Sequence, residues 1–124
     1  MPITYRVDAG EALILTTATG TLSDDDILAH KRALLDDPSV VPGMAELSDV
    51  RGVTELAVTT DGIRMFTSFD RTNARPDGRL AIVASEDFTF GTARMYQMGG
   101  AEDNVGVFRT VEEARDWLGL PTTE

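Results

Sequence analysis

The chain has few side chains of the kinds that carry enzyme chemistry. It contains no cysteine and a single histidine, His30, which excludes thiol nucleophiles, disulfides and two-histidine metal sites. His30 lies three residues after Ile27 and four before Leu34, at the border of an apolar helix face. We interpret it as a partly buried, hydrogen-bonded helix residue rather than a catalytic base. The sequence also lacks a nucleophile elbow, a phosphate-binding loop and a dinucleotide fingerprint.

Three carboxylates remain as candidates for acid–base work. Asp49 ends one expected strand, and Glu86 and Asp87 follow another. Ligands of parallel sheets gather beyond the carboxyl ends of the strands, so these acids could form a base of raised pKa or hold a hard cation. Asp49 is better explained as an acceptor for loop amides, and no calcium-loop spacing is present. We therefore expect no metal and no cofactor, and we rank an enzyme below a binding protein.

Large apolar side chains concentrate in two expected helices, over residues 60–70 and 87–98. These helices carry more such groups than one buried face requires, which favours core packing, an apolar ligand pocket or a dimer surface. The expected ligand- or partner-binding residues are Met65, Phe66, Phe69, Phe90, Met95, Tyr96 and Met98. Gly91, next to Phe90, would let a ligand or another backbone approach closely.

Composition limits the class of partner. The chain has 124 residues and a formal net charge of −10, a size typical of one domain, which we assign to residues 1–124. An acidic protein repels phosphate backbones and anionic lipid headgroups, so we expect neither nucleic acid nor membrane insertion. The absence of cysteine fits a reducing cytosol, and the start, MPITYRVD, does not have the pattern of a secretory signal. We therefore expect a cytoplasmic protein.

Hydrophobic patterning predicts nine elements in the order β-β-α-β-α-β-α-β-α. The expected strands are Ile3–Asp8, Glu11–Ala18, Met44–Val50, Leu80–Ala84 and Val105–Arg109, and residues 51–58 stay unassigned. Leu80–Ala84 is an unbroken apolar run, which predicts a strand covered on both faces. Helix starts are expected at Ser23, Thr59 or Thr60, Ser85 and Thr110, which are residues that cap helices well. The order predicts an α/β fold with a mixed, mostly parallel five-stranded sheet and helices on both faces.

Several segments together resemble a known superfamily. They are TGTL at Thr19–Leu22, LSDVR at Leu47–Arg51, RLAIV at Arg79–Val83, FGTARMY at Phe90–Tyr96 and VFR at Val107–Arg109, with Glu113-Ala114 and Trp117-Leu118. In this arrangement the chain resembles STAS-like proteins, which include anti-sigma-factor antagonists and sulfate-transporter tails. It is more similar to a branch of small bacterial proteins of unknown function that are also likened to CRAL-TRIO lipid-transfer domains. The resemblance implies the fold, whereas the branch has no agreed activity.

The resemblance also points to one modification site. In anti-sigma-factor antagonists a Ser or Thr at the start of the helix after the third strand is phosphorylated. Thr60 in the segment TTDG is the matching residue, with Thr59 in place of the usual preceding acid. Phosphate at a helix start is electrostatically favourable. Our leading hypothesis is a non-enzymatic STAS-like module, a homodimer, that binds a protein partner or a small apolar ligand. The alternative is an antagonist-type switch with Thr60 as phosphoacceptor.

Overall fold

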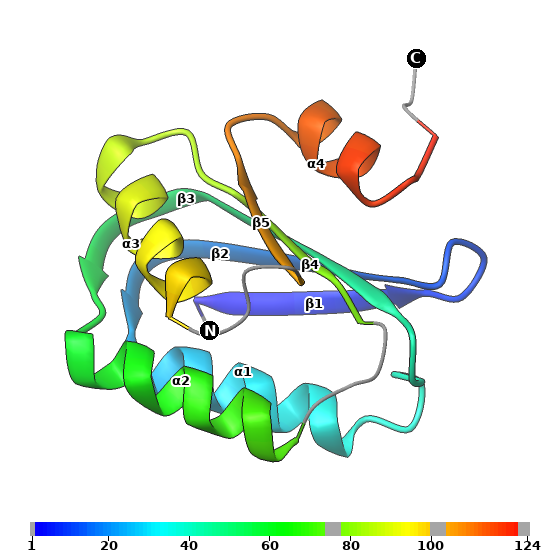
Figure 1. The fold of residues 1–124 in the computed structure, drawn as a ribbon, viewed down its shortest axis with the longest axis horizontal. Helices are drawn as coiled ribbons and strands as arrows, with labels where there is room; N and C mark the ends of the chain where they lie inside the picture. The colour runs from blue at the N-terminus through cyan, green and yellow to red at the C-terminus, as the bar shows by residue number, and fades with distance from the viewer. Residues whose placement is uncertain (1, 74–77, 100–103, 122–124) are drawn as a thin grey trace.

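A computed structural model describes residues 2–73, 78–99 and 104–121. Its elements follow one another in the expected order (Figure 1). They are β1 (Ile3–Asp8), β2 (Leu13–Ser23), α1 (Asp24–Asp36), β3 (Ala45–Ala57), α2 (Thr60–Thr72), β4 (Leu80–Val83), α3 (Asp87–Met98), β5 (Val105–Phe108) and α4 (Val111–Trp117). The predicted α/β fold is confirmed.

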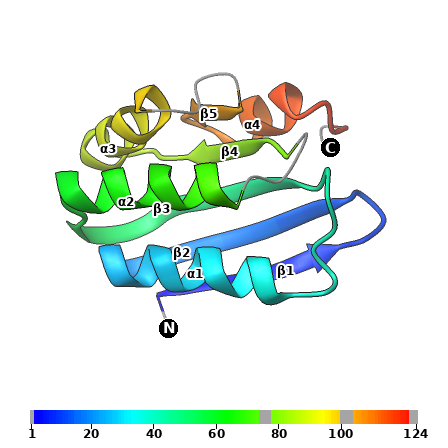
Figure 2. The same cartoon turned by 60° about the horizontal axis from the view of Figure 1, so that its bottom comes forward.

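The five strands form one sheet in the order β1-β2-β3-β4-β5. β1 runs antiparallel to β2, and the other neighbours pair in parallel. Each parallel connection therefore needs a crossover, which the chain supplies as a helix. Helices α1, α2 and α3 cover one face of the sheet and α4 covers part of the other (Figures 1 and 2).

Strand β4 is covered on both faces, as its unbroken apolar run predicts. Ile82 packs with Ala93 of α3 on one face. Ala81 and Val83 belong to a cluster with Ala114 on the other face. Val83 is 0% exposed. Burial of apolar surface on both sides of one strand is what holds helices against each face of the sheet.

Strands β2 and β3 extend well past their predicted ends. We expected them to stop at Ala18 and Val50, but their pairing continues to Ser23 opposite Ala57, after register shifts. The backbones of β2 and β3 come close together in this extension, because a Cβ on Gly52 would lie 2.8 Å from the side chain of Thr19. The residues in these extensions include exposed polar side chains, and apolar and polar residues alternate too weakly there to predict a strand. Pairing with the neighbouring strand therefore determines where β2 and β3 end.

Helix starts agree with the sequence in three of four cases. Ser23 and Asp26 form a reciprocal capping box at α1. The hydroxyls of Thr59 and Thr110 accept hydrogen bonds from the first turns of α2 and α4. The assignment of Ser85 was wrong, because α3 begins after Glu86 and has no side-chain cap.

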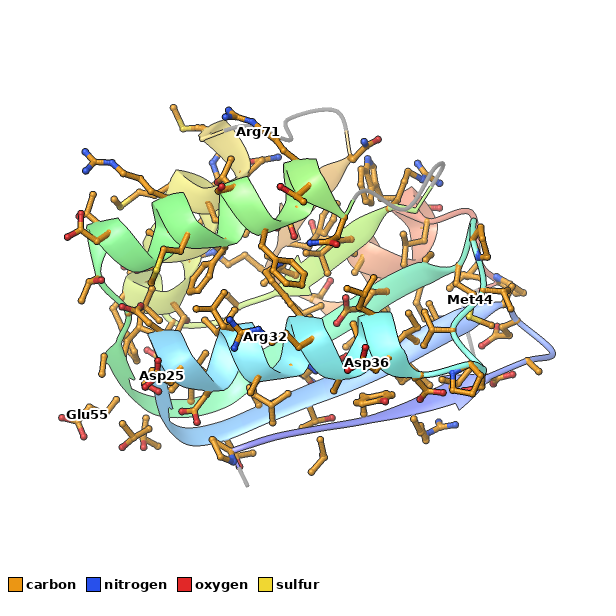
Figure 3. All side chains as sticks on the ribbon, turned by 90° about the horizontal axis from the view of Figure 1, so that it is seen from below. Asp25, Arg32, Asp36, Met44, Glu55 and Arg71 are labelled. Carbon is orange, nitrogen blue, oxygen red and sulfur yellow. The ribbon has the colours of Figure 1, made fainter. Side chains whose placement is uncertain are left out.

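Apolar clusters lie at both ends of α1. Ile14, Leu34 and Met44 form one cluster, and Figure 3 shows Met44 beyond Asp36, at the end of the helix. The other cluster is built from Ala18, Leu22 and Val53 with Ile27 near the start of α1. Between the two clusters lies Thr16, and this middle layer contains the candidate site. In the described ranges, no helix is both long and apolar enough to span a membrane.

Candidate functional site

A cavity of about 130 Å³ lies between the sheet and helices α1, α2 and α3. Every one of these three helices contributes side chains to it, as do β1, β2, β3 and β4. The apolar part of its wall includes Ile3, Ile27, Val50, Ile63, Phe66 and Ile82. An apolar cavity of roughly 150 Å³ in a protein core can admit benzene. The space is therefore close to the size that admits a single aromatic ring.

Small side chains line part of the cavity wall. Thr16 and Ala18 project into it from β2, Ser48 from β3, and Thr89 and Ala93 from α3. Protein cores normally pack to the density of organic crystals, so small residues on facing elements leave space unfilled. We expected recognition at the carboxyl ends of the strands. The cavity lies under the helices and includes part of that region, since Leu22 and Leu56 stand near the carboxyl ends of β2 and β3.

A buried carboxylate stands in the wall of the cavity. Glu46 is only 6% exposed, and its Oε2 accepts hydrogen bonds from Thr16 Oγ1 at 2.7 Å and His30 Nε2 at 2.8 Å. Burial would raise the pKa of Glu46. The hydrogen bonds and charge of His30, the hydroxyl of Thr16 and the charge of Lys31 outweigh burial and hold the pKa below its ordinary value. The expectation that His30 is a hydrogen-bonded helix residue is confirmed.

A second polar group ties the three helices together. The ammonium of Lys31 on α1 donates to Asp70 Oδ1 at 2.9 Å and Oδ2 at 3.2 Å on α2, and to the hydroxyl of Tyr96 on α3 at 3.1 Å. The Tyr96 hydroxyl also bonds to Asp70. Lys31 and Tyr96 both line the cavity. An ammonium carries three hydrogens, so these partners use all the donors of Lys31.

The predicted binding residues divide between the cavity and the outer surface. Phe66 and Tyr96 line the cavity, with their ring centroids 6.3 Å apart. Met65, Met95 and Met98 are 46%, 51% and 65% exposed. The seven residues therefore do not form one site.

The last two predicted binding residues lie outside the cavity wall. Phe69 is half-buried on α2. The ring of Phe90 lies 4.0 Å from the guanidinium carbon of Arg109. A Cβ placed on Gly91 would meet nothing within 4 Å, so no backbone of the described chain makes the close approach expected there. The approach of a ligand to Gly91 stays a prediction.

The three candidate catalytic acids do not come together. Asp49 accepts hydrogen bonds from the backbone N–H and the guanidinium of Arg51, and the Arg51 side chain lowers its pKa despite partial burial. A base would need the opposite shift. Asp87 pairs with Arg109 at 2.9 Å, and Glu86 is exposed before α3. The role expected for Asp49, accepting from loop amides, was wrong in its partner, because the amide is that of Arg51 within β3 and the Arg51 guanidinium adds two further bonds. Over the described residues, no three His, Asp or Glu side chains form a metal-binding group.

Thr60 is exposed in the first turn of α2. The neighbouring Thr59 donates from its N–H and hydroxyl to the two oxygens of Asp24, at 2.9 and 2.6 Å. A Cβ on Gly62 would lie 2.0 Å from the same carboxylate, so glycine is needed for Asp24 to sit there. The carboxylate of Asp24 therefore lies beside the start of α2, where the helix dipole favours a negative charge.

Sequence reasoning did not find the buried polar residues of the cavity. Glu46 stands between Ala45 and Leu47 in an otherwise apolar strand start, and Lys31 is the only lysine of the chain, on a mostly apolar helix face. A charged residue in such a place is rarely buried without a partner. That was the available signal, and Asp70 and Tyr96 are the partners it could not identify.

The comparisons with known proteins bear on the fold. No protein-family model matches the chain, and no curated protein matches it significantly. An uncharacterized DUF3478 protein with a SpoIIAA-like fold, from Shewanella loihica PV-4, superposes with a TM-score of 0.60 at 16% identity over 94% of this chain and 93% of that one. An anti-sigma factor antagonist from Mycobacterium paratuberculosis superposes with a TM-score of 0.60 at 17% identity over 94% of each chain. The chain therefore has a SpoIIAA-like fold, which is the fold that the resemblance in its sequence implies.

Proposed function

We propose that the protein is a non-enzymatic binding module whose cavity takes a small, mainly apolar ligand. The observation that carries this proposal is the cavity of about 130 Å³ with its largely apolar wall. Transfer of an apolar ligand from water into such a wall gains roughly 25 cal/mol for each Å² of apolar surface buried. Pre-formed, mostly apolar cavities with a few polar groups are typical of small-molecule sites.

The polar groups of the cavity are arranged for binding rather than for reaction. Thr16 Oγ1 donates to Glu46 at 2.7 Å and lies 3.5 Å from His30 Nε2. In a nucleophile–base pair the hydroxyl would instead give its proton to the imidazole. Here the hydroxyl and the imidazole both serve the same carboxylate, which supports a structural role for the group.

Filling the cavity tests this proposal. Ser48→Leu would place an isobutyl group inside it, whereas Ser68→Leu makes the same change at an exposed site on α2. We expect toluene to raise the thermal unfolding midpoint of the wild type and of Ser68→Leu, since a ligand of the native state stabilises it. Ser48→Leu should lose this response. An equal response in Ser48→Leu, or no response in the wild type, would count against a ligand-binding cavity.

A second candidate is a regulatory module that binds a protein partner. The similarity in fold to an anti-sigma factor antagonist supports it, as does the exposure of Met65, Met95 and Met98 on α2 and α3. These side chains would also serve a homodimer, and the cysteine-free chain fits a cytoplasmic location. Sedimentation that finds only monomer at micromolar concentration would remove the homodimer.

Thr60 would be the phosphoacceptor of such a regulator. Phosphate there would join Asp24 and Asp61 around the start of α2, so we expect like charges to weaken the bonds between Asp24 and Thr59. The test is mass spectrometry of the protein isolated from its own cells, together with affinity capture by the wild type and by Thr60→Ala and Thr60→Glu. An unmodified Thr60 and the same captured partner for all three proteins would exclude this switch.

A further inference from the structure

We infer that the cavity selects ligands that carry no negative charge: a single ring or short alkyl chain that ends in a hydroxyl or an amine, and not in a carboxylate. The inference rests on the proposed function and deepens it. It follows from the balance of charge around the cavity and from the hydrogen bonds that already occupy its positive groups.

The positive charges of the polar wall are offset by ion pairs. Glu46, His30 and Lys31 line the cavity, whereas Asp70 lies outside the wall and pairs with Lys31 at 2.9 Å. With a neutral imidazole the charges of these four residues sum to −1, and with a protonated imidazole they sum to zero. Counted with its ion-pair partners, the wall therefore offers no surplus of positive charge. The chain as a whole adds a formal net charge of −10, which disfavours anions further.

Lys31 and the Nε2 atom of His30 also already have hydrogen-bond partners. Lys31 gives its three hydrogens to both oxygens of Asp70 and to the Tyr96 hydroxyl, and His30 bonds to Glu46 at 2.8 Å. A ligand carboxylate could accept from the hydroxyl of Ser48, but to pair with a positive group it would have to take a donor from Asp70 or Glu46. That exchange would leave a buried carboxylate of the protein without its hydrogen-bond donor. The ligand carboxylate would also lose the free energy of its own hydration.

A hydroxyl or an amine meets no such conflict. Its hydrogens can bond to the oxygen atoms of the wall, and Ser48 and Thr16, which line the cavity, carry hydroxyls that can both donate and accept. The apolar body of the ligand would lie against Phe66, Ile82 and their neighbours. The cavity volume of about 130 Å³ limits that body to about one ring.

The experiment compares four ligands of one ring size: toluene, benzyl alcohol, benzylamine and benzoate, by calorimetric titration of the intact protein near neutral pH. We expect benzyl alcohol and benzylamine to bind at least ~10-fold more tightly than benzoate, as one unfavourable charge typically costs that or more. Benzoate binding as tightly as benzyl alcohol would overturn the inference while leaving the proposed function in place. If toluene and benzyl alcohol both fail to bind, the proposed function fails and the inference fails with it.

A matched pair of variants tests the cause. Asp70→Asn removes the carboxylate that engages Lys31, whereas Asp61→Asn removes a carboxylate whose side chain is 87% exposed on the same helix. We expect Asp70→Asn to raise the affinity for benzoate by about 10-fold relative to benzyl alcohol. Asp61→Asn should leave the ratio unchanged. An unchanged ratio in a folded Asp70→Asn protein, verified by near-ultraviolet circular dichroism, would show that the charge balance around Lys31 does not set selectivity.

Discussion

The two faces of the sheet are built from alternate residues of the same strands, yet they are packed differently. On the α4 face, Leu13, Leu47 and Val83 pack against Ala114 and Leu118. On the other face, the cavity and its buried polar group lie beneath three helices. In β2 two consecutive residues show the contrast: Leu15 packs on the α4 side of the sheet, whereas Thr16 lines the cavity.

Where β5 meets α4, the α4 face leaves little room. The rings of Phe108 and Trp117 lie 5.5 Å apart, and a Cβ on Gly106 would come within 2.6 Å of the Phe108 ring. This part of the face therefore uses its residues for stability, whereas an open hollow of about 350 Å³ is lined by β1, β2, β3 and α4. The face under α1–α3 gives up packing contacts around Thr16 and Ser48 and places charged residues there, which is the cost expected of a binding site.

The largest expected effect is on the cavity face, where His30→Ala removes the partner of a buried carboxylate. Glu46 would keep Thr16 as a donor but lose the imidazole at 2.8 Å. Breaking a buried pair from one side costs about 3–5 kcal/mol, which urea unfolding would measure. Replacing both His30 and Glu46 by leucine leaves no unpaired buried charge, so the double variant should recover much of the lost stability. If the single variant is as stable as the wild type, the pair contributes nothing to the fold.

Next in size is a pair of leucine truncations that compares the faces directly. Leu13 is 0% exposed on the α4 face, and Leu22, 5% exposed, lines the cavity. Leu→Ala in a packed core costs about 2–5 kcal/mol, and more where the surroundings cannot relax. We expect Leu13→Ala to be the more destabilising of the two in chemical unfolding. The reverse order would mean that the cavity face is the better packed of the two.

Acid should weaken the cavity face through Glu46. Burial opposes but does not prevent the lowering of its pKa by His30, Thr16 and Lys31 below the ordinary value of 4.5. The folded protein then binds a proton there less readily than the unfolded chain does. The stabilisation is complete above the ordinary pKa and is lost as the pH falls through the lowered folded pKa.

The measurement is urea unfolding from about pH 7 to about pH 3. Glu46→Gln cannot titrate at this position, so its stability should fall less steeply with acid than that of the wild type. Asp61→Asn removes an exposed carboxylate and serves as the control. Parallel curves for Glu46→Gln and the wild type would show that Glu46 does not couple to folding.

The fold could be predicted because its signals are local. The apolar run Leu80–Ala84 predicts a strand that is covered on both faces of the sheet, and the capping box of Ser23 and Asp26 marks the start of α1. The ends of β2 and β3 could not be predicted, since residues such as Val53 and Glu55 are held by pairing with the neighbouring strand. Local sequence does not contain that pairing.

The cavity could be predicted only in part. Phe66 and Tyr96 belong to the predicted aromatic set because they are large and lie at helical spacing. The space itself depends on small side chains from facing elements, among them Thr16, Ser48 and Ala93. These residues come from three different elements, and nothing in any one segment indicates that all three line the same cavity. The sequence pattern placed recognition at the strand ends, where only part of the cavity wall lies.

The smallest expected effect tests that strand-end alternative against the cavity. Arg109 follows β5, pairs with Asp87 at 2.9 Å and lies over the ring of Phe90. Its side chain is 44% exposed, so Arg109→Gln should cost only about 0.5–1 kcal/mol of stability. The increase in unfolding midpoint caused by toluene should be unchanged, because Arg109 does not line the cavity. Loss of that increase in Arg109→Gln, with the stability kept, would move the binding site to the strand ends and away from the space beneath the helices.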